Sequence, residues 1–137
     1  MQLSYPTKIL IAWGEAISGN KLIKEWLLAN GYKELGLFVH ALNNQQEARD
    51  WLMKNKFPHL MALIRGAEGE EKAVKWLEQY NFSPLAKVAL AADGDVAAVN
   101  WLIENNYREL AVISQKIKII KDDIQRRNDD VHSISPD

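Results

Sequence analysis

The side chains that could hold a metal ion are few and widely spaced in this sequence. The chain contains 3 histidines and no cysteine. His40 and His59 lie in different predicted helices, and His132 is close to the C-terminus. No two of them have the four-residue spacing with which a helix presents paired histidines to zinc. We therefore predict no metal site and interpret the histidines as solvated surface residues.

Acidic pairs are the other groups that could carry acid–base chemistry. They are Glu70–Glu71, Asp93–Asp95 and Asp122–Asp123. All three pairs fall at predicted helix N-termini or on polar faces, where carboxylates interact favourably with the helix dipole or with water. A GxSxG nucleophile pattern and a glycine-rich phosphate loop are both absent. We expect a non-enzymatic protein without a cofactor, and an enzyme with an unrecognised site is the alternative.

Basic residues cluster on the last predicted helix and could contact phosphate groups. The cluster comprises Lys116, Lys118, Lys121, Arg126 and Arg127. Acidic residues interleave with it, and the net charge of −1 gives no overall attraction to nucleic acids or anionic membranes. A second basic ridge contains Arg65 and Lys87, near His40. Nucleic-acid binding through such a ridge is disfavoured and is kept as the alternative function.

The elements that position these residues follow a 25-residue period. Trp26, Trp51, Trp76 and Trp101 are each followed by a leucine. Six residues after each of these tryptophans comes a second aromatic residue. Nine residues after each tryptophan comes another leucine. This agreement without insertions indicates one structural unit repeated in tandem.

Each unit is predicted to contain two short antiparallel helices. In one unit, Ala48 and Leu52 share a helix face with Trp51, and Leu60 and Ile64 share a face of the next helix. Glycine and asparagine recur where the helices should end, and the short connections force consecutive helices to run antiparallel. We expect the four periodic tryptophans to be buried between stacked units. Trp13 falls in a column with Phe38, Leu63, Val88 and Ile113 and is also predicted to be a core residue.

The predicted fold class is all-α, a right-handed superhelix (α-solenoid) of antiparallel helical hairpins with a 25-residue repeat. Residues 1–127 should form a single domain of about nine helices, followed by a disordered polar tail at 128–137. The chain begins half-way through a unit, which leaves one helix flank exposed. Either Met1–Pro6 covers this flank or a second copy of the chain does, as a homodimer. The sequence contains no membrane-spanning run, and we expect a cytoplasmic protein.

Repeated helix pairs of this kind, as in Trp101–Leu110 and the segments aligned with it, resemble the HEAT- and armadillo-like α-solenoids. The resemblance covers roughly residues 7–127 and is one of architecture. It implies a curved surface suited to binding macromolecules. The leading hypothesis is therefore a scaffold or binding module for an unknown protein or peptide. Its candidate binding face consists of the variable positions on the second helices: Leu37, His40, Ala62, Arg65, Lys87, Leu90, Val112 and Gln115.

Overall fold

The computed structural model describes the backbone of residues 4–134 and the side chains of residues 4–129. Within this part of the chain all regular structure is helical and no strand occurs, which confirms the all-α prediction. The helices are α1 (Thr7–Ile17), α2 (Lys21–Ala29), α3 (Lys33–Leu42), α4 (Gln46–Lys54), α5 (Pro58–Ala67), α6 (Glu71–Gln79), α7 (Ser83–Ala92), α8 (Val96–Glu104) and α9 (Arg108–Ile134).

The junctions between helices use the residues that the sequence singled out. Asn20 and Asp95 cap α2 and α8 by accepting hydrogen bonds from the backbone N–H groups of Ile23 and Ala98. A proline stands in the first turn of α5 and of α7, where its missing N–H costs no hydrogen bond. Left-handed residues end the helices, and most of them are glycine or asparagine; Lys56 is the exception, with φ 71°.

The odd-numbered helices supply most of the core. Each of them buries several side chains, and one repeated column among these is Trp13, Phe38, Leu63, Val88 and Ile113, all at most 1% exposed. The Trp13 and Phe38 rings meet edge to face with their centroids 5.0 Å apart. The even-numbered helices cover this layer and bury only a narrow stripe each. The core role that the sequence predicted for Trp13 is confirmed.

The four periodic tryptophans are not core residues, contrary to the prediction. Trp26 is 47% exposed, and the other three are half-buried. The reason is that each outer helix has room for one buried stripe, and the leucine after each tryptophan occupies it: Leu27, Leu52, Leu77 and Leu102 are all 0% exposed. A tryptophan one residue earlier is rotated by about 100° around the helix axis. It therefore lies at the edge of the stripe, partly in solvent.

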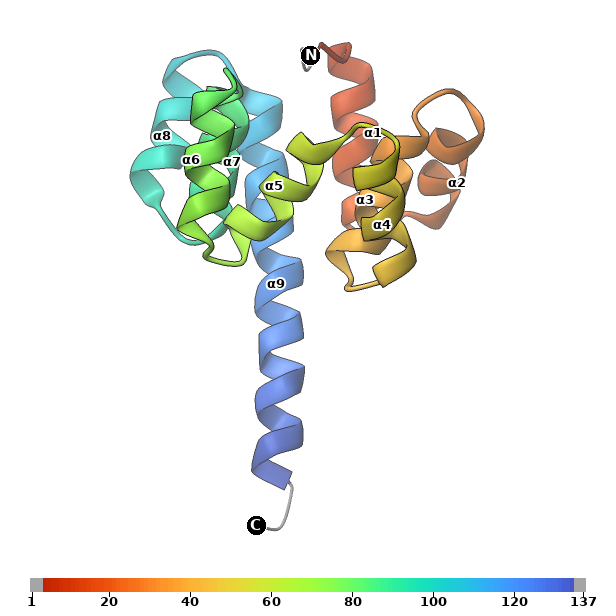
Figure 1. The fold of residues 1–137 in the computed structure, drawn as a ribbon, viewed down its shortest axis with the longest axis vertical. Coiled ribbons are helices and arrows are strands. Elements are labelled where there is room, and N and C mark those ends of the chain that lie inside the picture. The colour runs from red at the N-terminus through yellow and green to blue at the C-terminus, as the bar shows by residue number, and fades with distance from the viewer. Residues whose placement is uncertain (1–3, 135–137) are drawn as a thin grey trace.

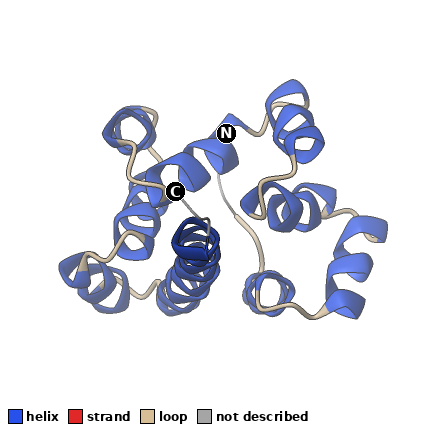
Figure 2. Ribbon diagram, turned by 90° about the horizontal axis from the view of Figure 1, so that it is seen from below, coloured by secondary structure: helices blue, strands red, loops and turns tan. Residues whose placement is uncertain are grey.

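The first part of the last helix, α9, lies beside the first helix, α1. It packs against α1 as well as against α7. A Cβ atom on Gly14 of α1 would lie 3.6 Å from Ile113 Cγ1 of α9, an ordinary packing distance. Figure 1 shows α9 between α6–α8 on one side and α1–α4 on the other, and Figure 2 shows the same arrangement from below. The sequence predicts that one side of the first helix is exposed. In the structure, α1 is in contact with α9 of the same chain.

The C-terminal half of α9 extends away from the other helices (Figure 1). The helix continues to Ile134, although the sequence predicts a disordered tail from Asn128. Polar side chains one turn apart support this helix: Lys118 pairs with Asp122, and Gln125 donates a hydrogen bond to Asp129. Each such pair contributes a few tenths of a kcal/mol. Residues 135–137 of the predicted tail lie outside the described residues.

Candidate functional site

The periodic tryptophans of the even-numbered helices form aromatic pairs with residues at the start of the next odd-numbered helix. Each indole stacks nearly parallel on the aromatic residue that follows it by six positions. The pairs are Trp26–Tyr32, Trp51–Phe57, Trp76–Phe82 and Trp101–Tyr107, with centroids 6.2, 5.8, 6.3 and 5.9 Å apart. Stacking fixes the orientation of each indole and leaves the rest of its surface available for other contacts.

Lysine side chains from the preceding helix cover two of these indoles. Lys33 Nζ lies 5.3 Å from the ring centroid of Trp51, and Lys87 Nζ lies 5.5 Å from that of Trp101. Both distances suit a cation–π interaction. In the unit between them, the corresponding positions are Pro58 and Ala62, which are too short to cover a ring. Among the described residues, no cation lies over Trp76.

The space beside Trp76 is a hollow of about 280 Å³ between α5 and α6, which we call the α5–α6 hollow. Its lining residues are Met53, Pro58, Met61, Ala62, Arg65, Glu70, Lys72, Ala73 and Trp76.

The α5–α6 hollow has an apolar floor and a charged rim. The floor is made of Met61, Ala62 and Ala73, which are buried by their neighbours. Met53, which is 52% exposed, and the half-buried Trp76 also line the hollow. The charged lining residues are all exposed. An arrangement of this kind can bind an apolar side chain, and it contains no nucleophile placed beside a base.

The residues of the candidate binding face lie in several environments. Ala62 and Arg65 both line the α5–α6 hollow, whereas Lys87 is engaged with Trp101. His40 lines a separate depression with Lys24, and burial, together with the positive charge of Lys24, lowers the pKa of its imidazole. The remaining four residues are half-buried or exposed: Leu37 and Leu90 are half-buried, and Val112 and Gln115 are exposed.

The structure adds Met53, Met61 and Trp76 to the candidate site, and sequence reasoning had missed them. The methionines fall in columns that were not considered, and Trp76 was assigned to the core. One signal could have found the hollow, because Ala62 replaces the larger Leu37 and Lys87 of the neighbouring units.

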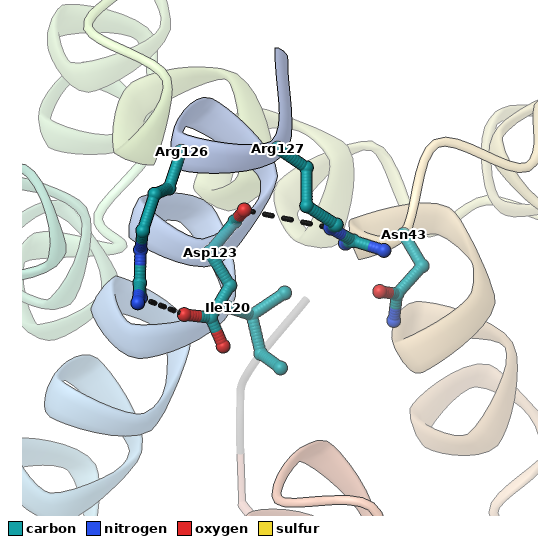
Figure 3. Close-up of a pocket in the computed structure, with 5 residues that line it drawn as sticks. All are labelled: Asn43, Ile120, Asp123, Arg126 and Arg127. Atoms are coloured by element: carbon teal, nitrogen blue, oxygen red, sulfur yellow. Dashed lines mark hydrogen bonds and ion pairs between the residues drawn. The ribbon is translucent and has the colours of Figure 1, made fainter. Parts of the chain in front are cut away.

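The basic cluster of α9 is largely neutralised by contacts within the protein. Lys116 pairs with Glu15, Lys118 with Asp122, and Arg126 with Asp123. Arg127 Nε donates a long hydrogen bond of 3.4 Å to the backbone oxygen of Asp123. Figure 3 shows Arg127 beside Asn43 and Arg126 on the other side of Asp123, around a depression between α9 and the end of α3. Little positive charge therefore remains there for binding phosphates.

A network around Glu68 joins α9 to the hairpins. Glu68 accepts hydrogen bonds from Arg49, at 3.1 Å, and from Lys121, at 2.7 Å. Burial alone would raise the pKa of Glu68, but these two cations outweigh it and lower the pKa. Lys121 also donates to the backbone oxygen of Leu42, and Arg49 to that of Ala41, so both satisfy carbonyls at the C-terminus of α3. We assign this network a structural role.

His59 is buried, and its interpretation as a solvated surface residue is wrong. It is only 2% exposed and stacks on Phe82 with ring centroids 4.8 Å apart. Its Nδ1 atom has no hydrogen-bond partner among the described residues. Burial lowers the pKa of the imidazole from 6.5 to about 4. His59 packs here because a neutral imidazole fits the aromatic layer formed by Phe57 and Phe82. The side chain of His132 lies outside the described residues.

This buried histidine predicts a loss of stability in acid. Between pH 6.5 and 4 the unfolded chain binds a proton on His59 that the folded chain does not, so the free energy of unfolding falls as the pH falls. The full effect is roughly 3 kcal/mol. Carboxylates titrate in the same pH range and also change the stability. The free energy of unfolding in urea should therefore be measured at several pH values in this range for both the protein and its His59→Phe variant. The variant's relative stability should rise steadily towards acid pH, and parallel stability curves would contradict the assignment.

Two further properties of residues 4–134 complete the description. None of their helices combines the length and the hydropathy needed to cross a bilayer. No group of three or more histidine, aspartate or glutamate side chains in the described part is arranged to hold a metal ion. Comparisons of the chain with models of protein families, with curated proteins and with solved structures give no match.

Proposed function

We propose that this protein is a non-enzymatic module that binds a protein or peptide through the α5–α6 hollow. In this proposal the chain is a right-handed α-solenoid of helical hairpins with a 25-residue repeat, and the units differ in what covers the periodic tryptophan. The observation that carries it is the contrast between units. Lysines cover Trp51 and Trp101 from within the chain, whereas neither Trp26 nor Trp76 has a cation of the described residues over its ring. Of the latter two, Trp76 contacts Tyr80 at a centroid distance of 4.7 Å and borders an apolar floor that is open to an incoming side chain.

The size and chemistry of the hollow support an anchoring role. A volume of about 280 Å³ accommodates one large apolar side chain. Full burial of such a side chain contributes about 1.5–3 kcal/mol, and binding hot spots are typically pockets with an aromatic wall. The two methionines of the lining are unbranched and polarisable, so they can adapt to different anchors.

Two observations favour this function over nucleic-acid binding. The cations of α9 are mostly paired with carboxylates of the same chain. The aromatic rings stack on one another, with Lys33 and Lys87 over two of them, so few ring faces are free for bases.

The test is a selection of random displayed peptides on the purified protein, with an Ala62→Lys variant for counter-selection. A lysine at this position should cover Trp76 as Lys87 covers Trp101 and should close the hollow. We expect enriched peptides to bind the parent protein and to bind the variant at least about tenfold more weakly. An Ala29→Lys variant makes the same substitution at an exposed position of α2, away from the hollow, and should bind like the parent. Peptides that bind all three proteins equally, or no enrichment at all, would refute the proposal, provided that the three melting temperatures agree.

A further inference from the structure

The rim of the α5–α6 hollow carries an excess of positive charge. Arg65 and Lys72 line the hollow, and Glu70 is the one carboxylate among the lining residues. In the neighbouring units, the two positions that correspond to Arg65 and Lys72 hold at most one basic residue. They are His40 and Glu47 in the unit before, and Leu90 and Ala97 in the unit after. Two cations beside the apolar floor are therefore a property of this unit and not of the repeat.

These two cations are available to a partner. Arg65 and Lys72 are both exposed, and neither takes part in the ion pairs found among the described side chains. Lys54 and Lys75, which adjoin the lining residues Met53 and Trp76 in the sequence, are exposed and unpaired in the same way, and so is Glu71 between Glu70 and Lys72. The exposed charges in and next to the lining are thus four cations and two carboxylates. The basic cluster of α9 differs, because carboxylates within the chain pair with most of its cations.

We infer that the α5–α6 hollow binds an acidic peptide segment with one large apolar side chain. The inference rests on the proposed function and specifies its partner. The apolar side chain lies on Met61 and Ala62 beside Trp76, and carboxylates before or after it in the peptide contact Arg65 and Lys72. A basic segment would meet two cations on the rim, where Glu70 is the one carboxylate of the lining. Complementary charge at a rim raises the association rate and sets specificity, while the apolar contact provides most of the affinity.

Two matched probe peptides test the sign of the charge. One has a central phenylalanine between glutamates, and the other has lysines in place of the glutamates. Each is titrated into the 15N-labelled protein at low and at high salt. We expect the acidic peptide to bind about tenfold more tightly at low salt, with shifts at Ala62 and Ala73, and high salt should reduce this preference. The Ala62→Lys variant should weaken binding of the acidic peptide.

Variants of the rim complete the test. The Arg65→Glu/Lys72→Glu variant should lose the preference for the acidic peptide. The Lys8→Glu/Lys21→Glu variant changes the net charge equally at exposed positions on α1 and at the start of α2, and should keep the preference. Equal binding of the two peptides, still blocked by Ala62→Lys, would overturn the charge inference and leave the proposed function standing. The inference would also be overturned if the acidic peptide bound equally well to the parent, to Arg65→Glu/Lys72→Glu and to Ala62→Lys. The absence of binding by either peptide would overturn it as well. An oligothymidine probe that competes at the hollow more strongly than the acidic peptide would also overturn it, since phosphates would then be the preferred anions.

Discussion

Replacing Trp13 by alanine should lower the free energy of unfolding by about 3–5 kcal/mol, the range for a large aromatic side chain removed from a core. Trp13 is 0% exposed and meets the ring of Phe38 edge to face at 5.0 Å. Alanine would leave a cavity between α1 and α3 that the rigid helices cannot fill. Urea unfolding followed by circular dichroism measures the loss directly, because it needs no tryptophan signal.

The control for this prediction is Trp76→Ala. Trp76 is half-buried at the edge of the α5–α6 hollow, so we expect a loss of only about 1–2 kcal/mol. A ranking of Trp13 well above Trp76 would agree with the exposures in the structure. Equal losses would mean that the periodic indole is buried in solution, and the hollow that it borders would then be closed.

The helix pairs could be predicted from the sequence because their signals are local. Apolar residues three and four positions apart define a helix face, and a glycine or asparagine marks its end within a few residues. The core column that contains Trp13 and Phe38 was found in the same way. The helix signals depend on spacing within one unit and the core column depends on the 25-residue period between units, and both spacings are visible in the sequence.

The exposure of the periodic tryptophans could not be predicted because it depends on which helix of each pair lies outside. A buried Trp51 and a half-buried Trp51 give the same spacing from Leu52. The same reasoning applies to His59, whose polarity suggested the surface although stacked aromatic rings cover it. Whether a helix lies in the inner or the outer layer depends on how the hairpins pack against one another. The spacing of residues within one unit does not contain that information.

Part of the α5–α6 hollow could be predicted from the sequence. Ala62 and Arg65 are variable positions of the repeat, but the meaning of Ala62 depends on Trp76 lining the same hollow. The substitution of a small residue where the neighbouring units have Leu37 and Lys87 is a sequence feature. It becomes a binding site only when the geometry shows that nothing else in the described chain fills the space.

The contact between α1 and α9 was also beyond the sequence, and it leads to the second large effect. Ile113→Asp should lower the free energy of unfolding by at least about 3 kcal/mol, because it places an unpaired carboxylate in a dry interface. Ile113 is 1% exposed and lies on the side of α9 that faces Gly14 of α1. In native-state hydrogen exchange, the amides of α1 should lose protection together with those of α7 and α9, since both helices pack against α9.

Val112→Asp is the matched control, because it introduces the same side chain one residue earlier at a position that is 49% exposed. It should cost no more than about 1 kcal/mol and leave the exchange of α1 unchanged. The two variants together distinguish an open stack from a closed one. In an open stack each unit is stabilised by its sequence neighbours, so damage in the last helix would not reach the first. If the amides of α1 keep their exchange protection in Ile113→Asp while those of α7 and α9 lose theirs, the contact between α1 and α9 does not stabilise α1. Loss of protection in α1 would instead mean that the first and last helices fold as one cooperative unit, although they are far apart in the sequence.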